Sequence, residues 1–203
     1  MPRDRAIGLL LKCTCVVCVF CQETFVTLHQ TLRSYAQAFP GDPHVQACLA
    51  FLEQAERPFD REHASGHFTG SAWLVSGDGE RVLLTHHRKL QRWLQLGGHA
   101  DGDSDLAAVA LREAAEESGL QGLTVEPGIF DVDRHWIPER KHEPGHWHYD
   151  VRYVVRAGEC EGYLVSDESL ALAWVPIRDL AYAQDTDESL RRMARKWLVR
   201  MSA

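Results

Sequence analysis

The sequence predicts an α+β fold, in which a mixed sheet carries helices on both faces. Short apolar or alternating segments typical of strands are interleaved with one acidic helix over residues 104–118, and a second helix over 186–200 closes the chain. A two-residue glycine pair, Gly97-Gly98, lies between the last short strand and the acidic helix. An α/β/α sandwich buries both faces of such a sheet, so we expect that layering.

Length and composition are those of a water-soluble globular protein. The chain has 203 residues, of which 45% are hydrophobic and 25% charged, enough for one domain with a sizeable core and a small appendage. The formal net charge is −7, so an acidic surface would repel phosphate backbones. Nucleic acid is therefore not an expected partner.

Residues 1–21 form a leader that we expect to be poorly ordered and outside the fold. Four cysteines fall within nine residues: Cys13, Cys15, Cys18 and Cys21. This spacing is too tight for a disulfide framework, and no second Cys or His pair at finger-like spacing supports a zinc site. Arg3 and Arg5 precede an apolar run, as in a signal peptide, but Lys12 interrupts it and no cleavage site follows. We expect a cytoplasmic protein with no membrane association.

Residues 22–62 are predicted to form an N-terminal helical segment. Apolar residues recur at spacings of three and four: Phe25, Leu28, Leu32, Tyr35 and Phe39. Residues 40–43, Pro-Gly-Asp-Pro, break this helix, and a second helix follows until Pro58. This helical pair suits packing or dimer contacts better than catalysis, so a homodimer is left open.

Residues 63–203 are predicted to form the main domain. A hairpin turn at 77–79 joins strands over 68–76 and 81–85. Further extended segments are expected at 92–96, 123–137, 146–155 and 170–175. Thr186 is the expected N-cap of the last helix.

The acidic helix places three carboxylates on one face. Glu113, Glu116 and Glu117 stand at i, i+3 and i+4, while the opposite side is small or apolar. Converging hard oxygen ligands suit Mg²⁺, or Mn²⁺ as the alternative. A solvated acidic face is the competing interpretation, but the adjacent glycines allow a close backbone approach and favour the metal site. Arg112 is expected to pair with Glu116 one turn on.

The segment Gly98 to Leu120 resembles the Nudix box, G-x5-E-x7-R-E-U-x-E-E-x-G-U with U aliphatic. Gly98 matches the first glycine, Arg112-Glu113 the R-E pair and Glu116-Glu117 the E-E pair, and Gly119-Leu120 ends the motif. Ser104 stands where the box has its first Glu, with Asp103 and Asp105 beside it. The strand order from about His67 onward also fits the family.

The resemblance implies a hydrolase that cleaves a phosphoanhydride bond in a nucleoside diphosphate linked to another moiety. It also implies divalent cations on Glu113, Glu116 and Glu117, joined by the backbone carbonyl of Gly97. Such a cation neutralises developing phosphate charge and lowers the pKa of an attacking water. Glu113 is the candidate base and Arg112 its catalytic neighbour. The expected partner is a small-molecule nucleotide substrate.

A second group of polar residues follows from strict alternation in the strand at 146–155. One strand face carries His146, His148, Asp150 and Arg152, and a similar row occurs at Asp131, Asp133 and His135. A wet sheet face would explain this pattern, but the rows could instead line a cleft opposite the carboxylates. The candidate substrate-binding residues are His99, His135, His146, His148 and Arg152. We expect His67, His86 and His87 to be surface residues.

Two other functions are compatible with these residues. An isomerase of a small diphosphate could use histidine-bound metal on the same fold. A non-catalytic module that senses a nucleotide would tolerate Ser104, but it would not need three converging carboxylates.

A truncation tests the assignment of the leader. A chain that begins at Gln22 is expected to be soluble, folded and active, because the leader supplies none of the inferred chemistry. Circular dichroism and turnover check this result. Aggregation, or loss of a stoichiometric metal together with activity, would show that residues 1–21 are structural.

Overall fold

The computed structural model describes residues 28–140, 144–167 and 169–202. The leader expected at residues 1–21 lies outside this range, as do residues 22–27 of the expected N-terminal helical segment. Within the described part, the order of strands and helices follows the sequence prediction closely.

An eight-stranded mixed sheet forms the centre of the molecule. Its two long strands, β1 (Gly66–Val75) and β7 (His146–Arg156), run parallel. Two strands pair antiparallel with β7: β5 (Thr124–Val125) and β6 (Asp131–Ile137). Beside β1 and also antiparallel lie β4 (Leu96–His99) and β2 (Arg81–His87). The sheet continues from β2 into β3 (Arg92–Leu94) and β8 (Ser169–Pro176).

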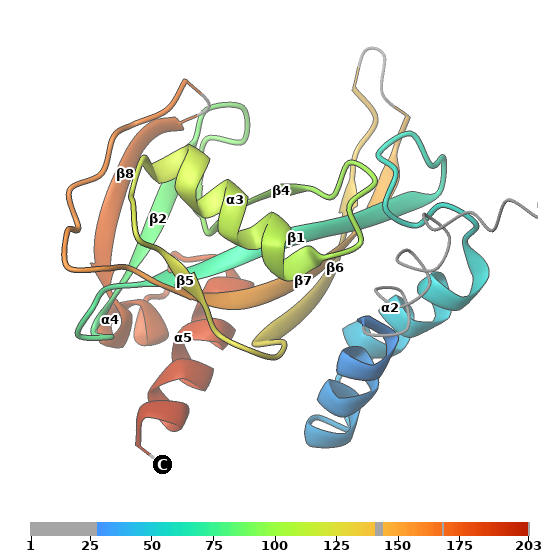
Figure 1. The fold of residues 1–203 in the computed structure, drawn as a ribbon, viewed down its shortest axis with the longest axis horizontal. Helices are drawn as coiled ribbons and strands as arrows, with labels where there is room; N and C mark the ends of the chain where they lie inside the picture. Colours follow the sequence, from blue (N-terminus) through green and yellow to red (C-terminus); the bar gives the residue numbers. More distant parts are fainter. Residues whose placement is uncertain (1–27, 141–143, 168, 203) are drawn as a thin grey trace, which may run out of the picture.

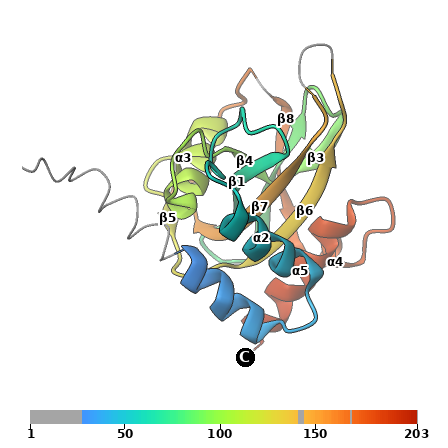
Figure 2. The same ribbon diagram turned by 90° about the vertical axis from the view of Figure 1, so that its right-hand side faces the viewer.

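Helices cover both faces of this sheet, which confirms the predicted α/β/α sandwich (Figures 1 and 2). On one face, α3 (Leu106–Ser118) packs directly over β1, where a Cβ at Gly70 would lie 2.8 Å from the Leu106 carbonyl oxygen. On the other face lie α4 (Ile177–Tyr182) and α5 (Glu188–Met201). Trp197 of α5 is fully buried there.

The N-terminal helical pair shares the core on the α3 side. The helical residues 28–38 and α2 (Pro43–Gln54) bury their apolar faces in the same cluster as the sheet. Phe51 of α2 stacks on Tyr149 of β7, with ring centroids 4.1 Å apart. The pair therefore packs on the sheet as a continuous part of the core. Among the described helices, none combines the length and the apolar character needed to cross a bilayer.

Three details differ from the sequence prediction. The short helix α4 was not expected, because its six residues carry too little periodicity to be recognised. The N-cap of α5 is Asp187 rather than Thr186, since the Asp187 carboxylate accepts the Ser189 N–H at 2.9 Å. Gly97 and Gly98 lie inside β4, paired with β1, and do not form a turn after a strand.

A buried ion cluster joins strands β6 and β7 to α5. Arg152 is 2% exposed, and its guanidinium donates to Asp150 at 2.7 Å, Asp133 at 2.8 Å and Asp131 at 3.2 Å. Arg192 of α5 also contacts Asp131 at 2.8 Å, and Lys196 contacts it at 3.4 Å. Three carboxylates and three cations therefore balance in the sheet interior. We call these six residues the Arg152 cluster.

Burial by itself would raise the pKa of Asp133, but Arg152 and Arg192 outweigh it and hold that pKa below its usual value. The carboxylate is therefore ionised in the folded protein at neutral pH. Its contribution to stability is complete above the unfolded-state pKa, about 3.9, and is lost as pH falls through the lower folded-state pKa.

Replacing Arg152 by methionine is expected to lower the free energy of unfolding by about 3–5 kcal/mol, because three buried carboxylates lose their shared cation. Urea denaturation at neutral pH measures this loss. Arg178→Met, on the exposed side of α4, is the matched control and should stay within about 0.5 kcal/mol of the unmodified protein. Equal losses for the two variants would show that the Arg152 cluster is not a stabilising element.

Candidate active site

The acidic helix is held at both ends. Asp105 caps α3 by accepting the Ala108 N–H at 3.1 Å, and Gly119 ends it in the left-handed region at φ 69°. Because Asp105 serves as this cap, the helix begins at Leu106, and Ser104 and Asp103 lie just before it rather than in its first turn. The buried face of α3 packs on β1 and β7, so the three glutamates lie toward the other side of the helix and its edge with β4.

The glutamates lie against the glycine pair of β4. Glu117 is 8% exposed and accepts the Gly97 N–H at 2.8 Å. A Cβ at position 98 would lie 2.5 Å from the Glu113 carboxyl carbon, so any larger residue there would displace that carboxylate from its present position. The glycine pair therefore lets two of the box carboxylates lie against the β4 backbone, at one side of the same cleft. Glu117 is more buried than the sequence suggested.

Arg112 orients Glu113. Its guanidinium donates to the Glu113 carboxylate at 3.1 Å and to the His99 carbonyl at 3.3 Å. The pairing expected with Glu116 is not formed among the described residues, because Glu113 and the β4 backbone lie closer. Arg112 thereby ties the acidic helix to the strand beside it.

The predicted carboxylate and imidazole groups meet in one cleft of about 450 Å³. The lining includes Glu113, Glu116, Glu117, Gly97, His99, His135 and His148. Thr69, Ser71 and Asp150 also contribute, and both hydroxyls donate to one oxygen of the Asp150 carboxylate, at 2.9 and 2.7 Å. The structure thus brings together the two groups that the sequence suggested separately.

Arg152 does not join them. Its side chain lies beneath the cleft, fully occupied by the carboxylates of the Arg152 cluster. The structure thus places Arg152, a candidate substrate-binding residue, outside the side chains that line the cleft. His146 is also buried, at 5% exposure, and does not line the cleft.

His67 is the residue that sequence reasoning missed. It was expected at the surface, yet it is 0% exposed. The parallel register places it next to His148, and its ring centroid lies 4.8 Å from that of His148 and 4.9 Å from that of His146. The signal in the sequence was alternation in β1, where His67, Thr69 and Ser71 share one strand face.

Burial keeps the rings of His67 and His148 neutral at neutral pH. Burial lowers the pKa of His67 to about 3, and neighbouring His99 and His146 add to the effect. Burial likewise lowers the pKa of His148 to about 2, followed by the influence of His67 and His99. Burial lowers the pKa of His135 as well. Neutral rings offer lone pairs and N–H donors, so they do not act as cationic clamps for phosphate.

The carboxylate group fits a hard divalent cation. Glu113, Glu116 and Glu117 supply oxygen ligands, and β4 brings backbone against them without intervening side chains. This is the donor set that Mg²⁺ prefers. The same residues could hold Mn²⁺.

Comparison with known proteins gives one family. A protein-family model described as "NUDIX domain" matches residues 67–197 of this chain. A MutT protein from Methanosarcina mazei Go1 superposes with a TM-score of 0.54 at 16% identity, covering 70% of this chain and 99% of that one. An Ap4A hydrolase from C. elegans gives a TM-score of 0.52 at 16% identity, covering 66% and 97%. A NUDIX-family hydrolase from Clostridium perfringens gives 0.50 at 22% identity, with the same coverage. Among curated proteins no match was found.

The cleft assignment generates a kinetic prediction. His148→Ala should lower kcat/KM by about tenfold or more, because it removes a polar group from the cleft. Tyr149→Phe, one residue away on the opposite strand face, should leave kcat/KM unchanged. Steady-state kinetics and melting temperatures of both variants check this. If kcat/KM is unaltered in His148→Ala, the strand face is only hydrated surface.

Proposed function

This chain belongs to the Nudix family, whose members cleave phosphoanhydride bonds, and from that premise we propose a metal-dependent hydrolase of nucleoside diphosphate derivatives. The chain is thus a pyrophosphohydrolase, and the proposal concerns its substrate, its metal and the roles of its residues. The substrate would be a small-molecule nucleoside diphosphate linked to another moiety. The metal would be Mg²⁺, with Mn²⁺ as the alternative.

One observation carries the proposal: the three box glutamates and the Gly97-Gly98 backbone close on the same side of one polar cleft. Glu117 accepts the Gly97 N–H, and Glu113 lies against Gly98. Carboxylates that line one cleft repel each other, and a cation bound between them would offset that repulsion. A solvated acidic face would not need a glycine strand fitted against it.

The cation, when bound, neutralises charge on the phosphate oxygens and lowers the pKa of the attacking water. Glu113, Glu116, Glu117 and the Gly97 carbonyl would hold it. Glu113 would accept the proton from water, while Arg112 keeps its carboxylate in position by the contact at 3.1 Å. Water then adds to phosphorus as the phosphoanhydride P–O bond breaks.

The other side of the cleft would hold the substrate. His99, His135 and His148 line it, and imidazole rings can donate or accept hydrogen bonds. The Ap4A hydrolase among the fold neighbours is only 16% identical to this chain, so its title does not select the linked moiety here. A screen over nucleotide sugars, dinucleotides, nucleoside triphosphates and capped RNA would identify it.

The imidazoles beside the carboxylates favour one alternative, an isomerase of a small diphosphate that uses histidine-bound metal. The two functions differ in their products. Hydrolysis releases two phosphorylated fragments, whereas isomerisation returns a diphosphate of unchanged mass. Mass spectrometry of the reaction mixture separates them.

Glu117→Gln should lower kcat by at least about a hundredfold in saturating Mg²⁺, because one anionic ligand is lost from the metal cluster. The glutamine carbonyl can still accept the Gly97 N–H, so the fold should survive despite the burial of this side chain. Turnover on the substrate found in the screen measures the effect.

The matched control makes the same chemical change at an exposed position, Glu56→Gln, and should retain full turnover. Chelation should abolish activity and Mg²⁺ should restore it. Near-normal turnover of Glu117→Gln, with an unchanged melting temperature, would remove this residue from the metal site.

A further inference from the structure

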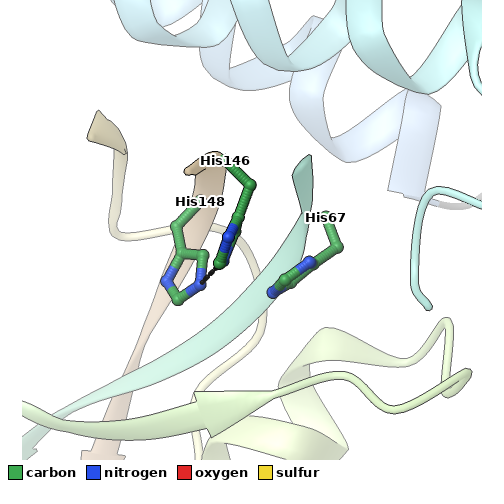
Figure 3. A group of neighbouring side chains, drawn as sticks. All are labelled: His67, His146 and His148. Atoms are coloured by element: carbon green, nitrogen blue, oxygen red, sulfur yellow. Dashed lines mark hydrogen bonds between the residues drawn. The ribbon is translucent and has the colours of Figure 1, made fainter. Parts of the chain in front are cut away.

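Three histidines from two parallel strands converge behind the cleft. His67 of β1 and His146 and His148 of β7 each point one ring nitrogen at a common space, and these nitrogens lie within 4.8 Å of one another (Figure 3). Tetrahedral zinc with Zn–N bonds of about 2.0–2.1 Å places its ligands about 3.3 Å apart. The His146 and His148 Nε2 atoms already lie 3.1 Å apart. A small rotation of the His67 ring would complete the set.

The tautomer of His146 suits a metal ligand. Its Nδ1 lies 2.8 Å from the Pro144 carbonyl oxygen, which can only accept, so Nδ1 carries the proton. The lone pair is therefore on Nε2, the atom facing His148. A ring N–H bonded to a backbone carbonyl is the arrangement that orients metal-bound histidines and raises their basicity.

His67 lacks the partners that a buried imidazole needs. Both of its ring nitrogens are inaccessible to solvent, and neither has a hydrogen-bond partner among the described residues. Leaving buried polar atoms unsatisfied costs about 1–3 kcal/mol. No packing requirement explains a histidine here, because an apolar side chain would fill the same space without that cost. A ligand on His67 would remove the penalty.

We propose that His67, His146 and His148 form a second metal site, distinct from the glutamates of α3, which takes a borderline transition-metal ion such as Zn²⁺. Imidazole nitrogens suit Zn²⁺, whereas oxygen ligands suit Mg²⁺. The three rings are packed together, with centroids 4.8–5.1 Å apart, so their nitrogen lone pairs can converge on one ion. Three protein ligands leave a fourth position open, as in catalytic rather than structural zinc sites.

The open position would face the cleft. His148 belongs to the histidine trio and also lines the cleft with Glu113. His99 lies beside the trio, with its ring centroid 5.0 Å from that of His67 and 5.1 Å from that of His148. A cation there would present a Lewis acid to the substrate from the side opposite the carboxylates. This inference does not rest on the proposed hydrolase activity.

The test measures Zn²⁺ binding to the full chain. The protein is first freed of metal with a chelator, and Zn²⁺ is then added in a calorimetric titration at neutral pH. Saturating Mg²⁺ is present throughout to occupy the glutamates. We expect one tightly bound Zn²⁺ per chain at the trio. His67→Ala and His148→Ala should each weaken Zn²⁺ binding by at least about a hundredfold. A loss of this size exceeds the effect of removing a residue that only hydrogen-bonds to a metal ligand. His29→Ala, a histidine outside the group that pairs with Glu53, should bind as the unmodified protein does.

Zinc on the leader cysteines is distinguished by a variant with Cys13, Cys15, Cys18 and Cys21 all changed to Ser. That variant should keep the trio's ion, with X-ray absorption showing nitrogen at about 2.0–2.1 Å and no sulfur at about 2.3 Å. Glu117→Gln should also keep it. Zn²⁺ binding that vanishes in the Cys or Glu variant, or that persists unweakened in both His variants, would overturn the proposal.

A stability measurement separates ligation from packing. His67→Leu should leave the melting temperature of the metal-free protein unchanged or higher, because an unsatisfied buried group is removed. The same variant should lose the rise in melting temperature that Zn²⁺ gives the unmodified protein. A lower metal-free melting temperature with an intact Zn²⁺ response would make His67 a packing residue only. If His67→Leu does not fold, His148→Gln replaces it in the Zn²⁺ measurement, where it should also lose the Zn²⁺-induced rise in melting temperature.

Discussion

The buried guanidinium of Arg152 is the constraint on which the rest of the site depends. A cation at 2% exposure must be neutralised, and carboxylates from β6 and β7 do so, with Arg192 and Lys196 of α5 balancing the excess negative charge. These contacts fix three elements relative to one another. One of the carboxylates, Asp150, is also the floor of the cleft, where Thr69 and Ser71 hold its second oxygen.

Above this floor the cleft has two chemically different walls. One wall is the α3 face with its glutamates, fitted against a strand that has no side chains at Gly97 and Gly98. The other wall is a set of neutral imidazoles contributed by neighbouring strands. Oxygen ligands and nitrogen ligands prefer different ions. Two metals of different kind could therefore act on one substrate from opposite sides.

Local patterns in the sequence determined the elements and the acidic wall. Helical spacing places Glu113, Glu116 and Glu117 on one face whatever the helix packs against, because i, i+3 and i+4 are neighbours on any α-helix. Alternation likewise put His148 and Tyr149 on opposite faces of one strand, as the structure has them. The interleaving of strands with the acidic helix was enough to predict a sheet covered on both sides.

Which strand lies beside which was decided only by the tertiary structure. Alternation along a strand predicts which face of the sheet a side chain lies on, but it does not predict how deeply that side chain is buried. The sequence therefore could not show that Arg152 lies beneath the cleft, in contact with Asp131 and Asp133, which are 19 to 21 residues away. The same limit applies to His67. It contacts His148 only because β1 and β7 pair in parallel, in a register that brings together residues 81 positions apart in the sequence, such as Thr69 and Asp150. Long-range pairing depends on the packing of the whole sheet, which no local pattern encodes.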